Sequence, residues 1–234
     1  LQPILEGSTS DRDRRQVIHS RRKSAEHYRL QSPVPVTWPD DAKNIEAFVQ
    51  AFLKTEKQPL PPIVGYWYRV LGAWDGDLEN RALVLTTAIE GVVKTHFSDL
   101  GIPDEEFLAQ VAKAITELEK LQIGDRARAR AMESLKRAQS QSVKGALHAL
   151  SSNGVFEKAL VSTWTRTRNK AAHADELRFT EHEIQRHIDE LYGCLELFYS
   201  LFLHRIGYAG AIIHFSKAGW PEGPFPVVKN TNLL

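Results

Sequence analysis

A stretch in the C-terminal third of the chain places an arginine, an amide and a histidine among small residues: STWTRTRNKAAHADELRFT, residues 162–180. Arginine is always charged and can bind phosphate oxygens with two parallel N–H donors. Histidine, with an unperturbed pKa of about 6.5, is suited to moving a proton near neutral pH. Arg168, Asn169 and His173 are therefore candidate residues for chemistry at a phosphate group.

The spacing alone is not specific, because an arginine followed closely by a histidine also occurs at Arg14–His19 and at Arg22–His27. A pattern this short gains meaning only from its structural context. The motif lies in a predicted helix, and the helical repeat decides which of its side chains share a face.

On a regular helix Arg166, Asn169 and His173 share one face, because they are separated by three and four residues. Arg168 lies instead near the flank of the packing stripe that includes Trp164. Arg168 is therefore the residue positioned to reach inward, toward a carboxylate on a neighbouring helix.

Glu90 is the candidate for that carboxylate. It is the only charged residue in ALVLTTAIEGVV, residues 82–93, and it follows Ile89 on the packing stripe of a predicted helix. A carboxylate at such a position costs several kcal/mol unless a cation or several donors meet it, so we predict a pair between Glu90 and Arg168.

Two interpretations of this pair remain open. In the first, an ion pair fixes the register of two helices and His173 is a bystander near a helix end. In the second, the arginine and the histidine form a site for a phosphate.

Other residues offer weaker sites. His182 and His187 are five residues apart with no third ligand spaced to join them, so a zinc site is not expected. The single cysteine, Cys194, excludes an internal disulfide and lies in an apolar run, where an inert core thiol is the expectation. We expect no metal and no cofactor.

The bulk composition indicates a globular chain rather than a disordered one. The 234 residues are 42% hydrophobic and carry a formal net charge of +1, so binding of a polyanion must rely on local basic patches. No apolar run is long enough to cross a bilayer, and no signal-peptide pattern opens the chain. We expect a soluble, cytoplasmic protein without a membrane partner.

Helical periodicity dominates the chain and predicts an all-α helical bundle. A long helix is opened by an Asp77 cap and closed at Gly101, and the last helix opens with a capping box at Thr180 and Glu183. Helical patterns cover residues 42–57, 64–74, 77–101, 104–124, 126–139, 155–174 and 180–207.

The two ends of the chain differ from this body. Residues 1–40 lack periodicity and end in an extended proline-rich stretch, so we expect an N-terminal arm or linker from a longer protein. Residues 41–215 form the expected helical domain. Residues 216–234 are expected to be a short irregular tail, with at most a strand or hairpin near the β-prone AIIHF, residues 211–215.

The motif in its helical order resembles the HEPN domain family (higher eukaryotes and prokaryotes nucleotide-binding). The likeness rests on Arg-Asn-x-x-x-His at a helix end, on a preceding helix with an acid in LTTAIEGVVKTHF, and on a following capped helix that ends LFLHRIGYAG. It covers roughly residues 60–215 and is greatest to the ApeA-like branch of bacterial anti-phage proteins. The segment RARARAMESLKRAQSQS, residues 126–142, does not align.

The resemblance implies an all-α bundle that pairs into a homodimer and cleaves RNA without a metal. It implies that Arg168 and His173 are the catalytic pair, with Asn169 as the supporting polar residue and Glu90 as a recurring acid. Arg166 and Lys170 are expected to bind RNA. An upstream sensing region or a regulatory partner is also implied, and the alternative is a catalytically silent HEPN-like module that binds a nucleotide or a protein.

Overall fold

The computed structural model describes residues 30–37, 41–55, 62–173 and 180–226, so the expected arm before residue 30 and the tail after residue 226 lie outside the described residues. Within these ranges the chain is mostly helical with a single two-stranded sheet, which confirms the predicted all-α class. The elements are α2 (Ala42–Thr55), α3 (Pro62–Ala73), α4 (Leu78–His96), the 3-10 turn η3 (Ser98–Gly101), α5 (Glu105–Lys120), α6 (Asp125–Ala138), α7 (Val143–Ser152), α8 (Lys158–His173), α9 (Glu181–Arg205), β1 (Gly210–Ile213) and β2 (Glu222–Phe225).

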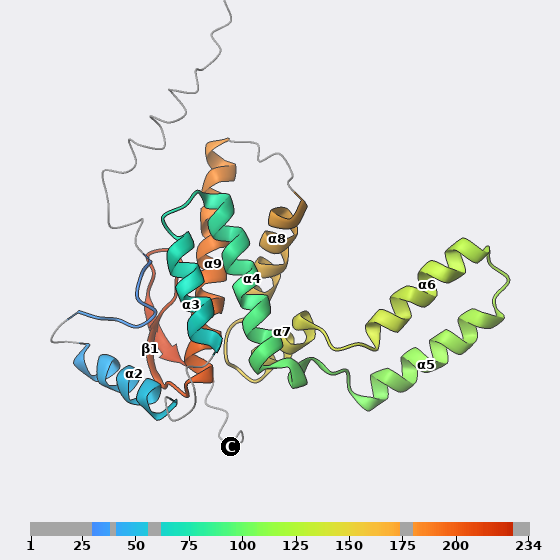
Figure 1. Ribbon diagram of the computed structural model, residues 1–234, viewed down its shortest axis with the longest axis horizontal. Coiled ribbons are helices and arrows are strands. Elements are labelled where there is room, and N and C mark those ends of the chain that lie inside the picture. Colours follow the sequence, from blue (N-terminus) through green and yellow to red (C-terminus); the bar gives the residue numbers. More distant parts are fainter. Residues whose placement is uncertain (1–29, 38–40, 56–61, 174–179, 227–234) are drawn as a thin grey trace, which may run out of the picture.

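Helix α9 is the centre of the bundle. It packs with α4 and α8, which also contact each other, while α3 lies on α4 (Figure 1). All residues of α9 from Glu190 to Leu203 are buried except Tyr192, because helices cover most of its circumference. The predicted cap is present, since the Thr180 side chain accepts a hydrogen bond from the Glu183 amide.

Helix α4 begins where the sequence predicts but ends earlier. The Asp77 side chain accepts a hydrogen bond of 2.7 Å from the Asn80 amide, which satisfies a donor of the first turn. The helix ends at His96, and Gly101 closes the 3-10 turn that follows. A Cβ at Gly101 would lie 2.4 Å from the Ser142 carbonyl oxygen, so this close approach requires glycine.

Helix α7 has no counterpart among the predicted elements. Its cap is Ser142, whose hydroxyl accepts a hydrogen bond of 2.9 Å from the Gly145 amide. The helix buries Ala146, Leu147 and Leu150 against the core. It is shorter than the other helices of the bundle, so the helical repeat of its apolar residues extends over fewer turns and is harder to recognise in the sequence.

Both edges of the predicted domain are joined to the core by hydrogen bonds. The Tyr199 hydroxyl donates to the Gln31 carbonyl at 2.5 Å, and the Ile213 amide donates to the Pro33 carbonyl at 3.0 Å. The proline-rich end of the expected arm, residues 30–37, thus packs on the body. At the other end, β1 and β2 pair antiparallel, so the expected boundary at 215/216 falls between two paired strands.

A buried carboxylate attaches this β-hairpin to α9. Glu196 lies 2.9 Å from Nδ1 of His214 and accepts a hydrogen bond of 2.8 Å from the Ser216 amide. Glu196 and His214 are both buried. The pair therefore satisfies two polar groups that would otherwise be buried without hydrogen bonds.

Replacing Glu196 with alanine is expected to lower the free energy of unfolding by about 2–3 kcal/mol, because it leaves the His214 ring and the Ser216 amide without their acceptor. Urea denaturation followed by circular dichroism measures the change. Glu222→Ala, an exposed acid on the same hairpin, is the matched control and should cost far less. Equal losses in the two variants would contradict the structural role of Glu196.

Candidate functional site

The candidate residues lie on α8, which runs between α4 and α9. Leu160, Val161, Trp164 and Thr167 form its buried face. Three cations, Arg166, Arg168 and Lys170, flank this face near the C-terminal end of the helix. Each of the three reaches a carboxylate on a neighbouring helix.

Arg168 binds Glu90 on α4, as predicted. Its Nε donates to Oε2 of Glu90 at 2.9 Å, and the guanidinium lies 5.9 Å from the centre of the Trp164 ring. The Trp164 indole N–H donates to the Thr86 carbonyl one turn earlier on both helices. These contacts join α8 to α4, and they help to fix the position of Arg168.

The hydrogen bond from Arg168 to Glu90 comes from Nε, and the terminal nitrogens donate no hydrogen bond among the described residues. The side chain is 46% exposed. A guanidinium has five N–H donors, so an arginine anchored through Nε still offers a fork of donors to an anion. Arg168 is thus positioned by the fold, and within the described residues its terminal donors remain available to an anion.

Glu90 has a second cation beside it. The Lys94 Nζ donates to its other oxygen at 2.6 Å, one turn along α4. The hydrogen bond from Lys94, aided by Arg168, outweighs partial burial and holds the pKa of Glu90 below its ordinary value of 4.5. Glu90 is therefore ionised at neutral pH and serves to orient cations.

Replacing Glu90 with glutamine is expected to reduce stability by about 1 kcal/mol or less at neutral pH, because the partners are half-exposed. The pKa is depressed in the folded state, so the stabilisation is present above pH 4.5 and is lost as the pH falls through the folded-state pKa. Urea titrations of both proteins at pH 7 and at pH 3.5 measure this.

The Glu90→Gln variant should approach the wild type at the lower pH. Glu119→Gln, an exposed acid on α5, is the control without a cation partner. A loss of stability as large in the Glu119→Gln variant at pH 7 would contradict the orienting role of Glu90.

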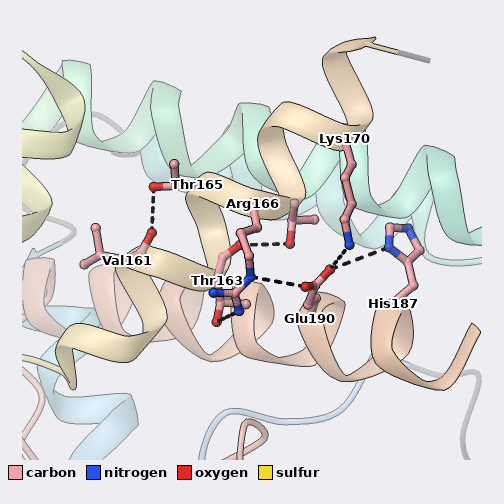
Figure 2. Close-up of polar contacts among 8 residues, drawn as sticks. Val161, Thr163, Thr165, Arg166, Lys170, His187 and Glu190 are labelled. Atoms are coloured by element: carbon pink, nitrogen blue, oxygen red, sulfur yellow. Dashed lines mark hydrogen bonds and ion pairs between the residues drawn. The ribbon is translucent and has the colours of Figure 1, made fainter. Parts of the chain in front are cut away.

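A second cluster, which the sequence analysis does not identify, lies between α8 and α9. Glu190 is buried and accepts from Lys170 at 2.7 Å and from Nε of Arg166 at 3.3 Å. Figure 2 shows both cations pointing down from α8 onto this one carboxylate. The other end of Arg166 also has a partner, since its Nη2 donates to the Thr163 hydroxyl at 3.3 Å.

The electrostatics of this cluster favour the ionised carboxylate. Burial alone would raise the pKa of Glu190, but the hydrogen bonds from Lys170 and Arg166 outweigh it and lower the pKa. The sequence carried the same signal that singles out Glu90. Glu190 precedes the core residue Leu191 directly, as Glu90 follows Ile89.

His187 completes the cluster from the same side of α9 (Figure 2). Its Nδ1 lies 4.0 Å from Glu190 and has no hydrogen-bond partner among the described residues. Burial, together with nearby Lys170, lowers the pKa of His187, so the ring is neutral near pH 7. The cluster is therefore held by the two α8 cations rather than by a histidine ion pair.

The remaining predicted site residues lie at the end of α8. Asn169 is exposed on the helix surface. His173 is the last residue of α8, and its side chain lies outside the described residues. Five residues of α-helix rotate a position by roughly 140°, so the backbone register places Arg168 and His173 on different faces of α8.

The other chemistry-bearing groups have structural surroundings. Cys194 is fully buried, and burial raises the pKa of its thiol to about 12, which confirms the predicted inert core thiol. Within the described ranges no three histidine, cysteine, aspartate or glutamate side chains gather as metal ligands would. No helix among those residues is both long and apolar enough to cross a bilayer.

Comparisons of the chain with protein families, with curated proteins and with solved structures find no match.

Proposed function

We propose that this chain is a metal-independent endoribonuclease module of a bacterial anti-phage or toxin system, acting on RNA in the cytoplasm as a HEPN-like homodimer. The observation that carries the proposal is Arg168, which is anchored to Glu90 through Nε while its terminal nitrogens donate no hydrogen bond among the described residues. This arginine belongs to the Arg-Asn-x-x-x-His sequence at the end of α8. The fixed guanidinium fits the task of binding a phosphate whose negative charge grows in the transition state.

The reaction needs only groups that the RNA and the motif supply. The ribose 2′-hydroxyl attacks the adjacent phosphorus, and a neutral imidazole of His173 accepts its proton. A bond forms between O2′ and phosphorus while the bond between phosphorus and O5′ breaks. A protonated imidazole gives its proton to O5′, so the products are a 2′,3′-cyclic phosphate and a 5′-hydroxyl.

The step uses one base and one acid, and each chain carries one Arg-Asn-x-x-x-His motif of this kind at the end of α8. A dimer in which the ends of two α8 helices face each other supplies both imidazoles and two copies of Arg168. The helical register supports this arrangement, because five residues of α-helix place the backbone positions of Arg168 and His173 on different faces of α8. Asn169 is exposed beside them, where an amide can bind ribose or phosphate oxygens.

The second candidate function is a catalytically silent HEPN-like module that binds a nucleotide or a protein. The observation in its favour is that Arg166, Arg168 and Lys170 each already have a carboxylate partner. Such pairs stabilise helix packing without any chemistry. The same residues would then recognise a ligand or serve structure alone.

Cleavage of RNA in the presence of EDTA separates the two candidates. Purified wild-type chain is incubated with a labelled single-stranded RNA, and the product ends are analysed for a 2′,3′-cyclic phosphate and a 5′-hydroxyl. The same strand with 2′-O-methyl riboses is the control, because it lacks the nucleophile and should stay intact. A folded, dimeric protein that leaves the unmodified RNA uncut would rule out the nuclease and favour the silent module.

A further inference from the structure

The hairpin of α5 and α6 extends away from the helical bundle (Figure 1). Its two helices pack on each other, and Val111 is the only residue of either helix that is buried. A segment that buries so little apolar surface adds little to the core. The role of the hairpin must therefore depend on its exposed side chains.

Charge is segregated between the two helices. Helix α5 carries four acids and two lysines, whereas α6 carries five cations and two acids. The cations of α6 are Arg126, Arg128, Arg130, Lys136 and Arg137. In a chain whose formal net charge is +1, this is a local basic surface of the kind that binds polyanions.

Arg128 ties α6 to the turn after α5, since its Nη2 donates to the Leu121 carbonyl at 2.8 Å, but within the described ranges the other basic residues of α6 do not join the two helices. The ion pairs of the hairpin, among the described residues, are local: Asp125 with Arg128, Glu133 with Arg137, and Glu117 with Lys120. None joins α5 to α6 in that part of the chain. Arg126, Arg130 and Lys136 are exposed and have no ion-pair partner there. The packing of α5 on α6 therefore does not account for the presence of these three basic side chains.

The geometry of α6 suits an extended row of phosphates. Arg126, Arg130 and Arg137 share one face, because they are four and seven residues apart. They span roughly 16 Å along the helix at 1.5 Å per residue, a length that covers several phosphates of a nucleic-acid strand. Ala127 and Ala129 beside them are exposed and small, so they leave the arginine side chains accessible.

We infer that this exposed face of α6 binds the phosphodiester backbone of RNA, and the inference rests on the proposed function because it makes the hairpin an arm that holds the substrate. Arginine forks match phosphate oxygens bidentately. A protein partner fits the face less well, because stable protein interfaces centre on buried apolar anchors. The large exposed apolar residues of the hairpin lie elsewhere, at Phe107 on α5 and at Leu121 and Ile123 in the turn.

The test measures binding apart from cleavage. The affinity for a 2′-O-methyl RNA strand is followed by fluorescence anisotropy between 50 and about 300 mM salt, since phosphate contacts are salt-dependent. The variant is Arg126→Gln with Arg130→Gln and Arg137→Gln, and glutamine preserves helix propensity. The matched control, Lys43→Gln with Lys113→Gln and Lys144→Gln, removes the same charge from exposed lysines outside α6.

The α6 variant is expected to lose at least tenfold in affinity at about 0.1 M salt, and the slope of log affinity against log salt should fall by about two to three. The control should stay within twofold of the wild type. An α6 variant that binds as well as the wild type, or a control that loses as much, would overturn the inference. So would a variant that keeps its RNA affinity but loses self-association in light scattering, because the face would then contact protein.

Cleavage assays separate this inference from the proposed function. With cleavable RNA the α6 variant should show a raised KM and an unchanged kcat, because α6 is remote from the motif at the end of α8. A wild type that binds RNA through α6 but never cleaves it would refute the nuclease and leave the binding surface standing. A wild type that cleaves, with an unchanged KM in the α6 variant, would refute the surface alone.

Discussion

Replacing His173 with alanine is expected to lower RNA cleavage by two or more orders of magnitude, the usual scale for losing a general acid or base. His173 is the last residue of α8, and for a polar residue at a helix end we expect the free energy of unfolding to change by about 1 kcal/mol or less. Single-turnover cleavage in EDTA measures the rate, and urea denaturation measures the stability. The exposed His182→Ala is the matched control and should keep the wild-type rate.

Mixed dimers decide whether the site is shared between two chains. Wild-type and His173→Ala chains carrying different tags are co-purified, and the heterodimer is assayed on the same RNA. If one chain supplies the base and the other the acid, the heterodimer should be nearly as slow as the doubly mutated dimer. Heterodimers that retain half the wild-type rate would show that each chain carries a complete site, and the composite mechanism would be wrong.

Replacing Arg168 with alanine is expected to reduce the cleavage rate at saturating RNA by about two orders of magnitude or more, the scale seen when a donor to developing charge is removed. Arg166→Ala should mainly weaken RNA binding. The physical difference lies in their donors. Arg168 uses only Nε on Glu90, whereas Arg166 bonds both Glu190 and the Thr163 hydroxyl.

Two controls accompany this pair of variants. Glu90 keeps Lys94 when Arg168 is removed, so Arg168→Ala should fold and show the wild-type thermal transition within a few degrees. Arg168→Lys keeps the charge but loses the planar fork, so it should restore only part of the rate. Loss of cleavage in Arg166→Ala with an intact rate in Arg168→Ala would reverse the assignment.

The sequence by itself determined most of the helices and one pair of side chains. Caps at Asp77 and Thr180 follow from local chemistry, because each satisfies an amide within its own first turn. The contact between Arg168 and Glu90 was predictable because each residue lies at the edge of an apolar stripe, and a partly buried charge requires an opposite one. The helical register of Arg166, Asn169 and His173 follows from spacing alone.

Only the tertiary structure decided which cations bind Glu190. The signal was present in the sequence, an acid beside a core residue, but Glu190 could be assigned to Arg166 and Lys170 only once α8 and α9 were packed together. This packing turns Arg166 and Lys170, expected to contact RNA, toward a buried acid. Their exposed fractions of 56% and 30% still leave both accessible to an anion.

The position of the α5–α6 hairpin was likewise undetermined by sequence. An amphipathic period predicts which face of a helix is covered but not what covers it. In α5 and α6 the cover is the other helix of the hairpin, so the pair stands outside the bundle with its cations exposed. The β-hairpin shows the converse, since Phe225 lies in a turn-rich stretch yet is buried in the core. Local patterns fix helices and caps because their partners are a turn away, whereas contacts between distant segments depend on how every other element has packed.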